Sequence, residues 1–451
     1  MSNDLNAREI LKQTIDMAWP SVVEGVLVVL AGMVDTYMVS SLGRATVSAV
    51  GITNQPKYFV FSAFFAINIA VSLLIARRVG EKRRDVANSL FLTGLIFVVG
   101  ACILFTILCV IFAEPLMVLN GSNEDSTVIA ARYFRIVMGG SIFNLLSLYI
   151  NAAQRGSGKT RIAMVTNVTS NVVNVICNYL LIGGHLGFPA LGADGAAIAT
   201  VFGTVIACVM SVISIFRKDS YINVGFIMKE KIKASWENAK ILTKTGVTIL
   251  GELLLTRVGF IINSILVAKL GTDSYAAHIV GMNFMNLGFG FGDGLQAASV
   301  ALVGRSLGEK DPIKARSYVR CAQKLGLGIA VLISLVVVIF RRPIYNAYFP
   351  NAEHMLLYGE MICFFIGVIM PIQVCKIVFN GALRGAGDVK FTLIGSTIGV
   401  TAIQPILTYI LIYVCHLELK AVWIGILVSQ AMQLILFGAR FASGKWKDKK
   451  V

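Results

Sequence analysis

Two carboxylate side chains lie within the first long apolar stretch of the chain, residues 16–40. Glu24 and Asp35 are eleven residues apart, and a helix that turns by about 100° per residue returns to nearly the same face after eleven steps. If this stretch spans a membrane, an ionised carboxylate inside it is costly and should face protein or a water-filled cavity. Such a carboxylate can take up a proton, or it can bind Na⁺ through its oxygens.

Amide side chains recur at helical spacing in the apolar stretch 163–183. Steps of four, three and four residues place on one face of a helix Asn167, Asn171, Asn174 and Asn178. Amide oxygens bind hard cations, but amide stripes also join neighbouring helices in membranes by hydrogen bonds. Both interpretations stay open for the amides. A lone carboxylate such as Asp35 is a costly way to join helices, so we expect Asp35 to bind an ion.

Two later apolar stretches, residues 245–268 and 275–303, carry a similar pattern. In the first of them, Glu252 and Asn263 are again eleven residues apart and share one helical face. The second stretch contains, at similar spacing, Asn283, Asn286, Gly290 and Asp293. The pattern predicts a second set of polar side chains inside the protein, in which Glu252 is a candidate second charge site.

The composition is that of a membrane protein. Of 451 residues, 56% are hydrophobic and only 14% are charged, whereas soluble globular proteins carry about 25% charged residues. The apolar stretches are long enough to cross a hydrocarbon core as helices and lack the alternation of barrel strands. We count twelve of them: 16–40, 57–76, 89–112, 128–150, 163–183, 195–216, 245–268, 275–303, 321–340, 355–379, 391–413 and 421–439. The expected fold class is an all-α membrane protein with twelve transmembrane helices.

The basic residues are distributed unevenly along the chain. The chain has 40 Lys and Arg residues against 24 Asp and Glu residues, a net charge of +16, and the basic residues lie mostly in the N-terminal segment and in every second loop. Few lie in the loops of the other side, among them Lys57. Because basic loops stay in the cytoplasm, we expect a multi-pass protein of the plasma (inner) membrane with both termini cytoplasmic. The distribution therefore indicates a lipid bilayer and no nucleic acid as the partner.

The two halves of the chain repeat each other. A shift of 228 residues superimposes Glu24 on Glu252, Asp35 on Asn263, and Gly80-Glu81-Lys82 on Gly308-Glu309-Lys310. Further matches follow at shifts of 229 and 230. Six helices per half is an even number, so both halves enter the membrane from the same side. We expect two pseudo-symmetric six-helix lobes, residues 1–225 and 226–451, with alternating access by rocking of one lobe against the other.

Two motifs suggest enzymatic or nucleotide chemistry, but each lacks a required part. Gly158-Lys159-Thr160 is similar to the end of a phosphate-binding loop, yet Ala153 stands where that loop needs glycine. Gly290-Phe291-Gly292-Asp293 matches the GxGD of intramembrane aspartyl proteases, which need a second aspartate nearby. The eight cysteines include no CxxC pair and no HExxH motif is present. We expect no enzyme activity, no cofactor, and no metal other than Na⁺ at Asp35.

Motifs along nearly the whole chain resemble those of the multidrug and toxic compound extrusion (MATE) family. They are Val34-Asp-Thr-x-Met38-Val39-x-x-Leu42-Gly43, Arg78-Val-Gly-Glu-Lys82, Gln154-Arg-Gly-Ser-Gly158, Asn178-Tyr-Leu-Leu-Ile182, Gly195-Ala-Ala-Ile-Ala-Thr200, Leu302-Val-Gly-x-x-Leu307-Gly308 and Gly381-Ala-Leu-Arg-Gly385. The resemblance implies a V-shaped bundle of twelve helices in two lobes. It also implies export of bulky, often cationic organic compounds in exchange for inward H⁺ or Na⁺.

The resemblance also assigns residues to sites. It implies that Asp35 binds the coupling ion and that the polar residues flanking it are Asn174, Asn178 and Thr200. Some members have an acid where this chain has Asn178, and others have one on the tenth helix, where this chain has Gln373. The candidate substrate or secondary charge residues are Glu24, Glu252, Asn263 and Gln373.

These observations lead to one mechanistic hypothesis. Binding of the cation neutralises Asp35 and changes the packing of the first helix, with Pro20 as a hinge, and release of the cation restores a charge that attracts a cationic substrate. Glu24, near the cytoplasmic end, could instead pair with an Arg or Lys from a loop. A lipid-linked precursor flippase of the same superfamily is the alternative, although only Arg257 and Lys376 could line a basic cavity. We expect a monomer, since lipid accounts for the apolar surface.

Overall fold

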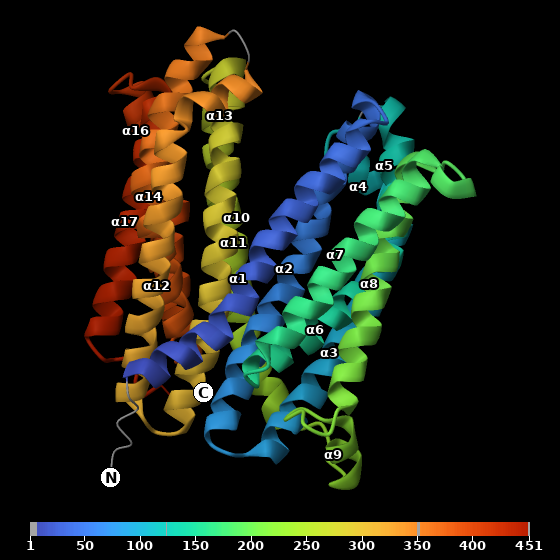
Figure 1. The fold of residues 1–451 in the computed structure, drawn as a ribbon, viewed down its shortest axis with the longest axis vertical. Helices are drawn as coiled ribbons and strands as arrows, with labels where there is room; N and C mark the ends of the chain where they lie inside the picture. Colours follow the sequence, from blue (N-terminus) through green and yellow to red (C-terminus); the bar gives the residue numbers. More distant parts are fainter. Residues whose placement is uncertain (1–6, 123, 350–351, 450–451) are drawn as a thin grey trace. The chain divides into compact units, whose positions relative to one another are not determined.

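The computed structural model describes residues 7–122, 124–349 and 352–449, and these residues form helices with no strand (Figure 1). The elements of the first half are α1 (Ala7–Ser40), α2 (Arg44–Gly80), α3 (Arg84–Ile111), α4 (Ala113–Leu119), α5 (Glu124–Gly139), α6 (Ser141–Gly156), α7 (Thr160–Gly183), η1 (His185–Gly187), α8 (Gly192–Phe216) and α9 (Val224–Lys229). Those of the second half are α10 (Trp236–Ala268), α11 (Thr272–Gly308), α12 (Pro312–Ile339), α13 (Arg341–Tyr348), α14 (Glu353–Gly385), α15 (Val389–Ser396), η2 (Thr397–Ile403), α16 (Gln404–Tyr413) and α17 (Glu418–Ala442).

Each of the twelve predicted spans has a helical counterpart. Within the described residues, ten helices are long and apolar enough to cross a membrane, and the pair α5–α6, bent by 46°, makes an eleventh. The remaining predicted span is α11, which has 37 residues. It is long enough to cross a bilayer, but its Gly, Asn and Asp residues make it too polar to qualify by hydropathy. The polar residues noted at helical spacing in this stretch of the sequence, such as Asn283, Asn286 and Asp293, are those that lower its hydropathy.

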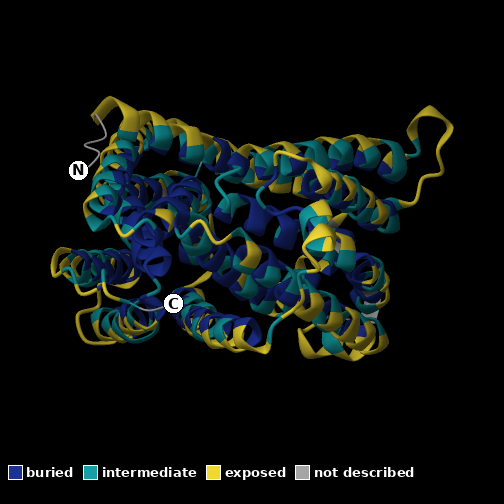
Figure 2. Ribbon diagram, turned by 90° about the horizontal axis from the view of Figure 1, so that it is seen from below, coloured by how far each residue is buried: buried dark blue, intermediate teal, exposed yellow. Residues whose placement is uncertain are grey.

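The lipid-facing surface follows the helical period. On α3, four apolar side chains between 51% and 64% exposed recur at steps of eight, three and four residues: Ile96, Leu104, Ile107 and Ile111. An exposed apolar stripe of this kind is stable only against lipid or another protein. Exposed positions (yellow in Figure 2) run along the outer faces of the helices, and buried positions lie between them.

The chain divides into two compact units. One is Val23–Val247, and the other joins the part of α1 up to Val22 to the residues from Thr248 onward. The lobes expected from the repeat were 1–225 and 226–451, so the units divide within helices α1 and α10 instead of in the connecting segment. That segment stays with the first unit because it bonds to α3: the Ser89 hydroxyl donates to the Lys233 carbonyl at 2.7 Å.

The start of α1 is attached to the second unit by its own contacts. The Tyr318 hydroxyl donates a hydrogen bond to the Gln13 side chain, and Ala18 belongs to the apolar core of that unit. A Cβ at Gly294 would lie 2.5 Å from the Val22 nitrogen, so only glycine lets α11 approach α1 this closely. The first helix therefore contributes to both units.

The repeat extends to backbone conformation. Gly43 and Gly271, which precede α2 and α11, have φ values of +95° and +109°, which favour glycine. Close helix packing repeats as well: a Cβ at Gly156 would lie 2.5 Å from the Ser72 carbonyl oxygen, and one at Gly385 would lie 2.5 Å from that of Val300. Small residues at these points let α2 meet α6 and α11 meet α14.

Candidate ion-binding site

Asp35 lies on α1 within the first unit, and its side chain is partly buried. The Asn178 amide nitrogen, from α7, donates to Asp35 Oδ1 at 2.7 Å. In the amide orientation that satisfies both of its ends, Asn174 donates to Asp35 Oδ1 and Oδ2 at 2.8 and 3.2 Å and accepts from the Thr200 backbone N–H at 3.1 Å. The carboxylate is thus held by neutral amide donors from one neighbouring helix.

The structure brings together all four residues assigned to ion coupling from the sequence. They come from three helices, α1, α7 and α8. Asn174 and Asn178 lie one helical turn apart on α7, so one face of that helix presents both amides to α1. Both amides are buried, with exposed fractions of 6% and 1%. The Asn178 Oδ1 atom is buried without a hydrogen-bond partner among the described residues. An unpartnered amide oxygen beside a carboxylate is a suitable ligand for a cation. The coupling function of the four residues stays a prediction.

Two further side chains belong to this site and were not assigned to it from the sequence. The buried Tyr133 hydroxyl, from α5, hydrogen-bonds Thr200 and interacts electrostatically with Asp35. Lys57, counted above with the loop residues, lies inside α2 and also interacts electrostatically with Asp35. The apolar stretch begins only at residue 57, so the polar first turns of α2 were taken for a loop. Tyr133 gave no signal, since a tyrosine in an apolar helix is ordinary.

Glu24 has a basic partner. The Arg155 guanidinium, at the end of α6, donates to Glu24 Oε1 at 2.8 Å, and Asn167 of α7 donates to the same oxygen. This ion pair matches the alternative considered from the sequence, in which Glu24 pairs with an Arg or Lys. Glu24 Oε2 is buried without a partner in the part of the chain that the structure describes. The geometry favours a structural ion pair.

Glu252 occupies the equivalent position in the second unit and is bound more completely. The Arg384 guanidinium lies 3.0 Å from Oε1 in an ion pair whose side chains are 6% and 3% exposed. Three uncharged side chains also donate to the carboxylate, at 3.1, 2.9 and 2.8 Å: Asn380, Thr392 and Ser396. Both oxygens are therefore occupied, which favours a structural ion pair over the secondary charge site expected from the sequence.

In the second unit, Asn263 and Thr408 stand at the positions that Asp35 and Asn178 occupy in the first, so no carboxylate is present there. The Thr408 hydroxyl donates to Asn263 Oδ1 at 3.3 Å. Gln373, on α14, is fully buried and donates to the Met285 carbonyl at 3.5 Å, while its Oε1 has no partner in the described chain.

Pro20 lies inside α1, which continues as helix across it, two residues before the division between the units.

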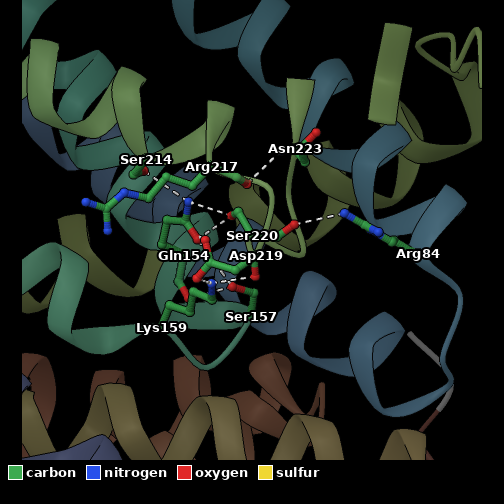
Figure 3. Close-up of polar contacts among 9 residues, drawn as sticks. All are labelled: Arg84, Gln154, Ser157, Lys159, Ser214, Arg217, Asp219, Ser220 and Asn223. Carbon is green, nitrogen blue, oxygen red and sulfur yellow. Dashed lines mark hydrogen bonds and ion pairs between the residues drawn. The ribbon is translucent and has the colours of Figure 1, made fainter. Parts of the chain in front are cut away.

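Polar contacts order the turn between α6 and α7 (Figure 3). The Lys159 ammonium donates to the Asp219 carboxylate at 2.6 Å, and this contact lowers the pKa of that exposed carboxyl below its usual range. The Gln154 amide donates to the hydroxyls of Ser214 and Ser220 at 3.0 and 3.1 Å. Lys159 thus pairs with the segment after α8, a structural function that accounts for the Gly-Lys-Thr motif.

Comparison with known proteins gives the family. A family model described as MatE matches residues 20–180 and, a second time, residues 248–410. The chain belongs to the MATE family. The double match is displaced by 228 residues at its start and 230 at its end, the same shifts as in the repeat described above.

Several relatives are similar to this MATE-family chain over nearly its full length. A probable multidrug resistance protein NorM of Thermotoga maritima is 25% identical over 98% of this chain and 94% of that protein. A protein of the same description from Bacillus cereus (ATCC 14579) is 28% identical over 96% of this chain and 94% of its own length. A structure described as the outward-facing conformation of a multidrug resistance MATE family transporter is 19% identical, covers 96% of both chains, and has a TM-score of 0.89. This chain is therefore a helical, multi-pass membrane protein of a transporter family.

Proposed function

We propose that this MATE-family chain is an antiporter that exports bulky, cationic organic compounds in exchange for inward H⁺ or Na⁺, with Asp35 as the coupling carboxylate. The observation that supports it is the contrast among the three carboxylates that lie in the apolar stretches of α1 and α10. Glu24 and Glu252 are paired with arginine, whereas Asp35 forms no ion pair within the described residues and accepts only from neutral amides. A carboxylate without a permanent cationic partner can exchange one cation for another.

The surrounding residues suit this exchange. Asn174 and Asn178 hold the ionised carboxylate in place, and the free Oδ1 of Asn178 adds an oxygen for Na⁺. For H⁺, the carboxylate alone is sufficient. Lys57 provides a positive charge that acts on Asp35 without contacting it. This charge lowers the affinity of Asp35 for a cation, so the bound cation can be released.

The transport cycle follows from neutralisation of one charge. Cation binding from outside would remove the charge of Asp35 and release a cationic substrate to the exterior; cation release to the cytoplasm would restore the charge and attract the next substrate. The two pseudo-symmetric units would provide alternating access, in the plasma (inner) membrane and with both termini cytoplasmic.

The test is Asp35→Asn in proteoliposomes loaded with ethidium, with H⁺ and Na⁺ gradients imposed separately. Wild-type protein should export ethidium on one or both gradients, and the variant on neither. Asp16→Asn is the matched control, because Asp16 is an exposed carboxylate on the same helix and should leave efflux unchanged. Normal gradient-driven efflux by Asp35→Asn would refute the proposed coupling site.

A further inference from the structure

The segment that joins α8 to α10 is strongly basic, and acids neutralise only part of its charge. Between residues 217 and 244 the chain has seven Lys or Arg residues and three Asp or Glu residues. One of these acids, Asp219, is already paired with Lys159, which lies outside the segment. Within the described residues no ion pair forms to four exposed lysines of the segment: Lys229, Lys231, Lys233 and Lys240. Such a surface attracts an anionic partner.

Hydrogen bonds hold this segment against the start of α3. The Arg84 guanidinium donates to the Ser220 carbonyl at 2.9 Å (Figure 3), and it lies 4.2 Å from the centre of the Phe226 ring of α9. Further along the segment, the Ser235 N–H donates to the Thr93 hydroxyl at 3.2 Å. The lysines therefore extend from a fixed backbone, which lowers the entropy cost of binding a partner.

The same contacts give the depth of the segment relative to the lipid-facing surface. Thr93, which binds Ser235, lies three residues before Ile96, where the exposed apolar stripe of α3 begins. At 1.5 Å per residue, this contact is about 4.5 Å along α3 from the start of the stripe. The Ser89 hydroxyl, which binds the Lys233 carbonyl, is about 10 Å from it. The segment thus lies at the level of the lipid head groups, which flank a hydrocarbon core of about 30 Å.

Two exposed apolar side chains lie among the lysines. Trp236, the first residue of α10, is 83% exposed, and Met228, on α9, is 73% exposed. Lys240 lies one helical turn after Trp236 and shares its face. Tryptophan is enriched at membrane interfaces because its ring is apolar and its N–H is polar. An exposed tryptophan beside lysines is typical of a surface that meets lipid, and a nucleic acid or soluble protein would have to displace head groups to reach it.

We propose that this segment binds anionic phospholipids of the adjacent leaflet, with lysine ammonium groups at the lipid phosphates and Trp236 at the boundary between head groups and acyl chains. The inference goes beyond the proposed export function and does not depend on it, because lipid binding needs neither Asp35 nor an ion gradient. Each lysine near an anionic leaflet strengthens the attraction, and several together should give at least about a tenfold preference for anionic over zwitterionic lipid. The exposed acids Glu230 and Glu237 reduce this preference without cancelling it.

The test is quenching of Trp236 fluorescence by brominated lipids around the full chain in nanodiscs of phosphatidylcholine. Brominated phosphatidylglycerol, which is anionic, and brominated phosphatidylcholine, which is zwitterionic, are added at increasing mole fractions in separate series. The signal of Trp236 is the difference between the wild type and Trp236→Phe, because both keep the other three tryptophans. Half-maximal quenching should occur at a mole fraction at least about tenfold lower with the anionic lipid.

A triple variant shows whether the lysines cause the preference. Lys229→Gln/Lys231→Gln/Lys233→Gln should bring the two half-maximal mole fractions close to equality. The matched control is Lys310→Gln/Arg320→Gln/Lys324→Gln, which removes three exposed basic residues from the second unit and should keep the preference. If the control variant lost the preference to the same extent, net charge alone would be the cause, and the proposal would be overturned.

Salt provides a second test on the unchanged chain. Higher ionic strength should reduce the preference of the wild type for the anionic lipid, because ions screen exposed charges. Inorganic phosphate at matched ionic strength should leave the quenching unchanged; displacement of the lipid would indicate a site for free phosphate instead. Equal quenching by both lipids in the wild type, or no quenching of Trp236 by either, would also overturn the proposal.

Discussion

At the scale of single residues, the partners of a carboxylate indicate its function better than its depth does. Glu252 is more deeply buried than Asp35, yet it is neutralised by Arg384 and by three uncharged donors. Asp35 has amide donors alone. A buried ion pair with full hydrogen bonding is a fixed part of the structure, whereas a carboxylate with neutral partners can change its charge.

Replacing Asn178 should identify the coupling ion. Asn178→Leu removes the donor at 2.7 Å from Asp35 and the free amide oxygen. With Na⁺, the site loses an oxygen ligand and the half-saturating Na⁺ concentration should rise. With H⁺, loss of a donor to the ionised carboxylate favours protonation, and half-maximal efflux should occur at a lower proton concentration. A charge-assisted hydrogen bond is worth about 1.5–3 kcal/mol, so the shift should be about tenfold or more. Unchanged values for both ions in efflux titrations would count against a function of Asn178 in coupling.

Removing the arginine partner should destabilise the second unit. Arg384→Met leaves Glu252 buried without a cation, and such losses cost about 3–5 kcal/mol. Thermal unfolding of the purified protein should show a clear drop, which the double variant Glu252→Gln/Arg384→Met should largely reverse. The equivalent change Arg155→Met should cost less, since Arg155 is 19% exposed against 6% for Arg384. Equal losses for the two arginines would contradict this account.

The site residues could be predicted from the sequence where they form a pattern. The spacing of Asn174 and Asn178 and the carboxylate in the first apolar stretch indicated polar helix faces, and the resemblance to the MATE family supplied their grouping with Thr200 around Asp35. The partners of Glu24 and Glu252 could not be derived, because nothing in the spacing of Arg155 and Arg384, in the last turns of α6 and α14, indicates which helix they meet. The periodicity of a sequence shows which face of a helix is polar, but it does not show which other helix packs against that face.

At the scale of elements, glycine determines where helices touch. Gly156→Ala would place a methyl group 2.5 Å from the Ser72 carbonyl oxygen, a contact with backbone that cannot rotate away. Separation of α2 and α6 should lower the thermal unfolding temperature and the yield of folded protein. Gly100→Ala is the control, because no atom lies within 4 Å of its Cβ position; in that exposed helical position alanine should be neutral or stabilise by about 0.5–1 kcal/mol. Equal behaviour of the two variants would show that the close approach does not matter.

The elements themselves were largely predictable, and the exceptions have local causes. The predicted stretch 128–150 is a helix pair bent by 46°, and hydropathy cannot show a bend. The stretch 391–413 contains the wide-turn segment Thr397–Ile403 just before Pro405. Proline lacks the N–H that a regular helix needs and clashes with the carbonyl four residues earlier, so the preceding turn widens.

At the scale of the molecule, the two units share a framework and differ in charge. The ion pairs Glu24–Arg155 and Glu252–Arg384 are equivalent in the repeat. The first unit then places a carboxylate at Asp35, and the second places the neutral Asn263 at the same point. The two units therefore share an ion-paired framework and differ in charge at the position of Asp35 and Asn263.

The orientation of the whole chain can be tested with its own cysteines. Cys415, between α16 and α17, is exposed, whereas the other seven cysteines are buried or partly buried. If the basic loops and both termini are cytoplasmic, the turn at Cys415 faces outward. A membrane-impermeant maleimide should therefore label intact spheroplasts through Cys415, and Cys415→Ser should abolish that signal. The substitution Ser443→Cys, made in the Cys415→Ser background at an exposed position, should react only after permeabilisation. The reverse pattern would invert the proposed topology and, with it, the direction in which Asp35 must receive its cation.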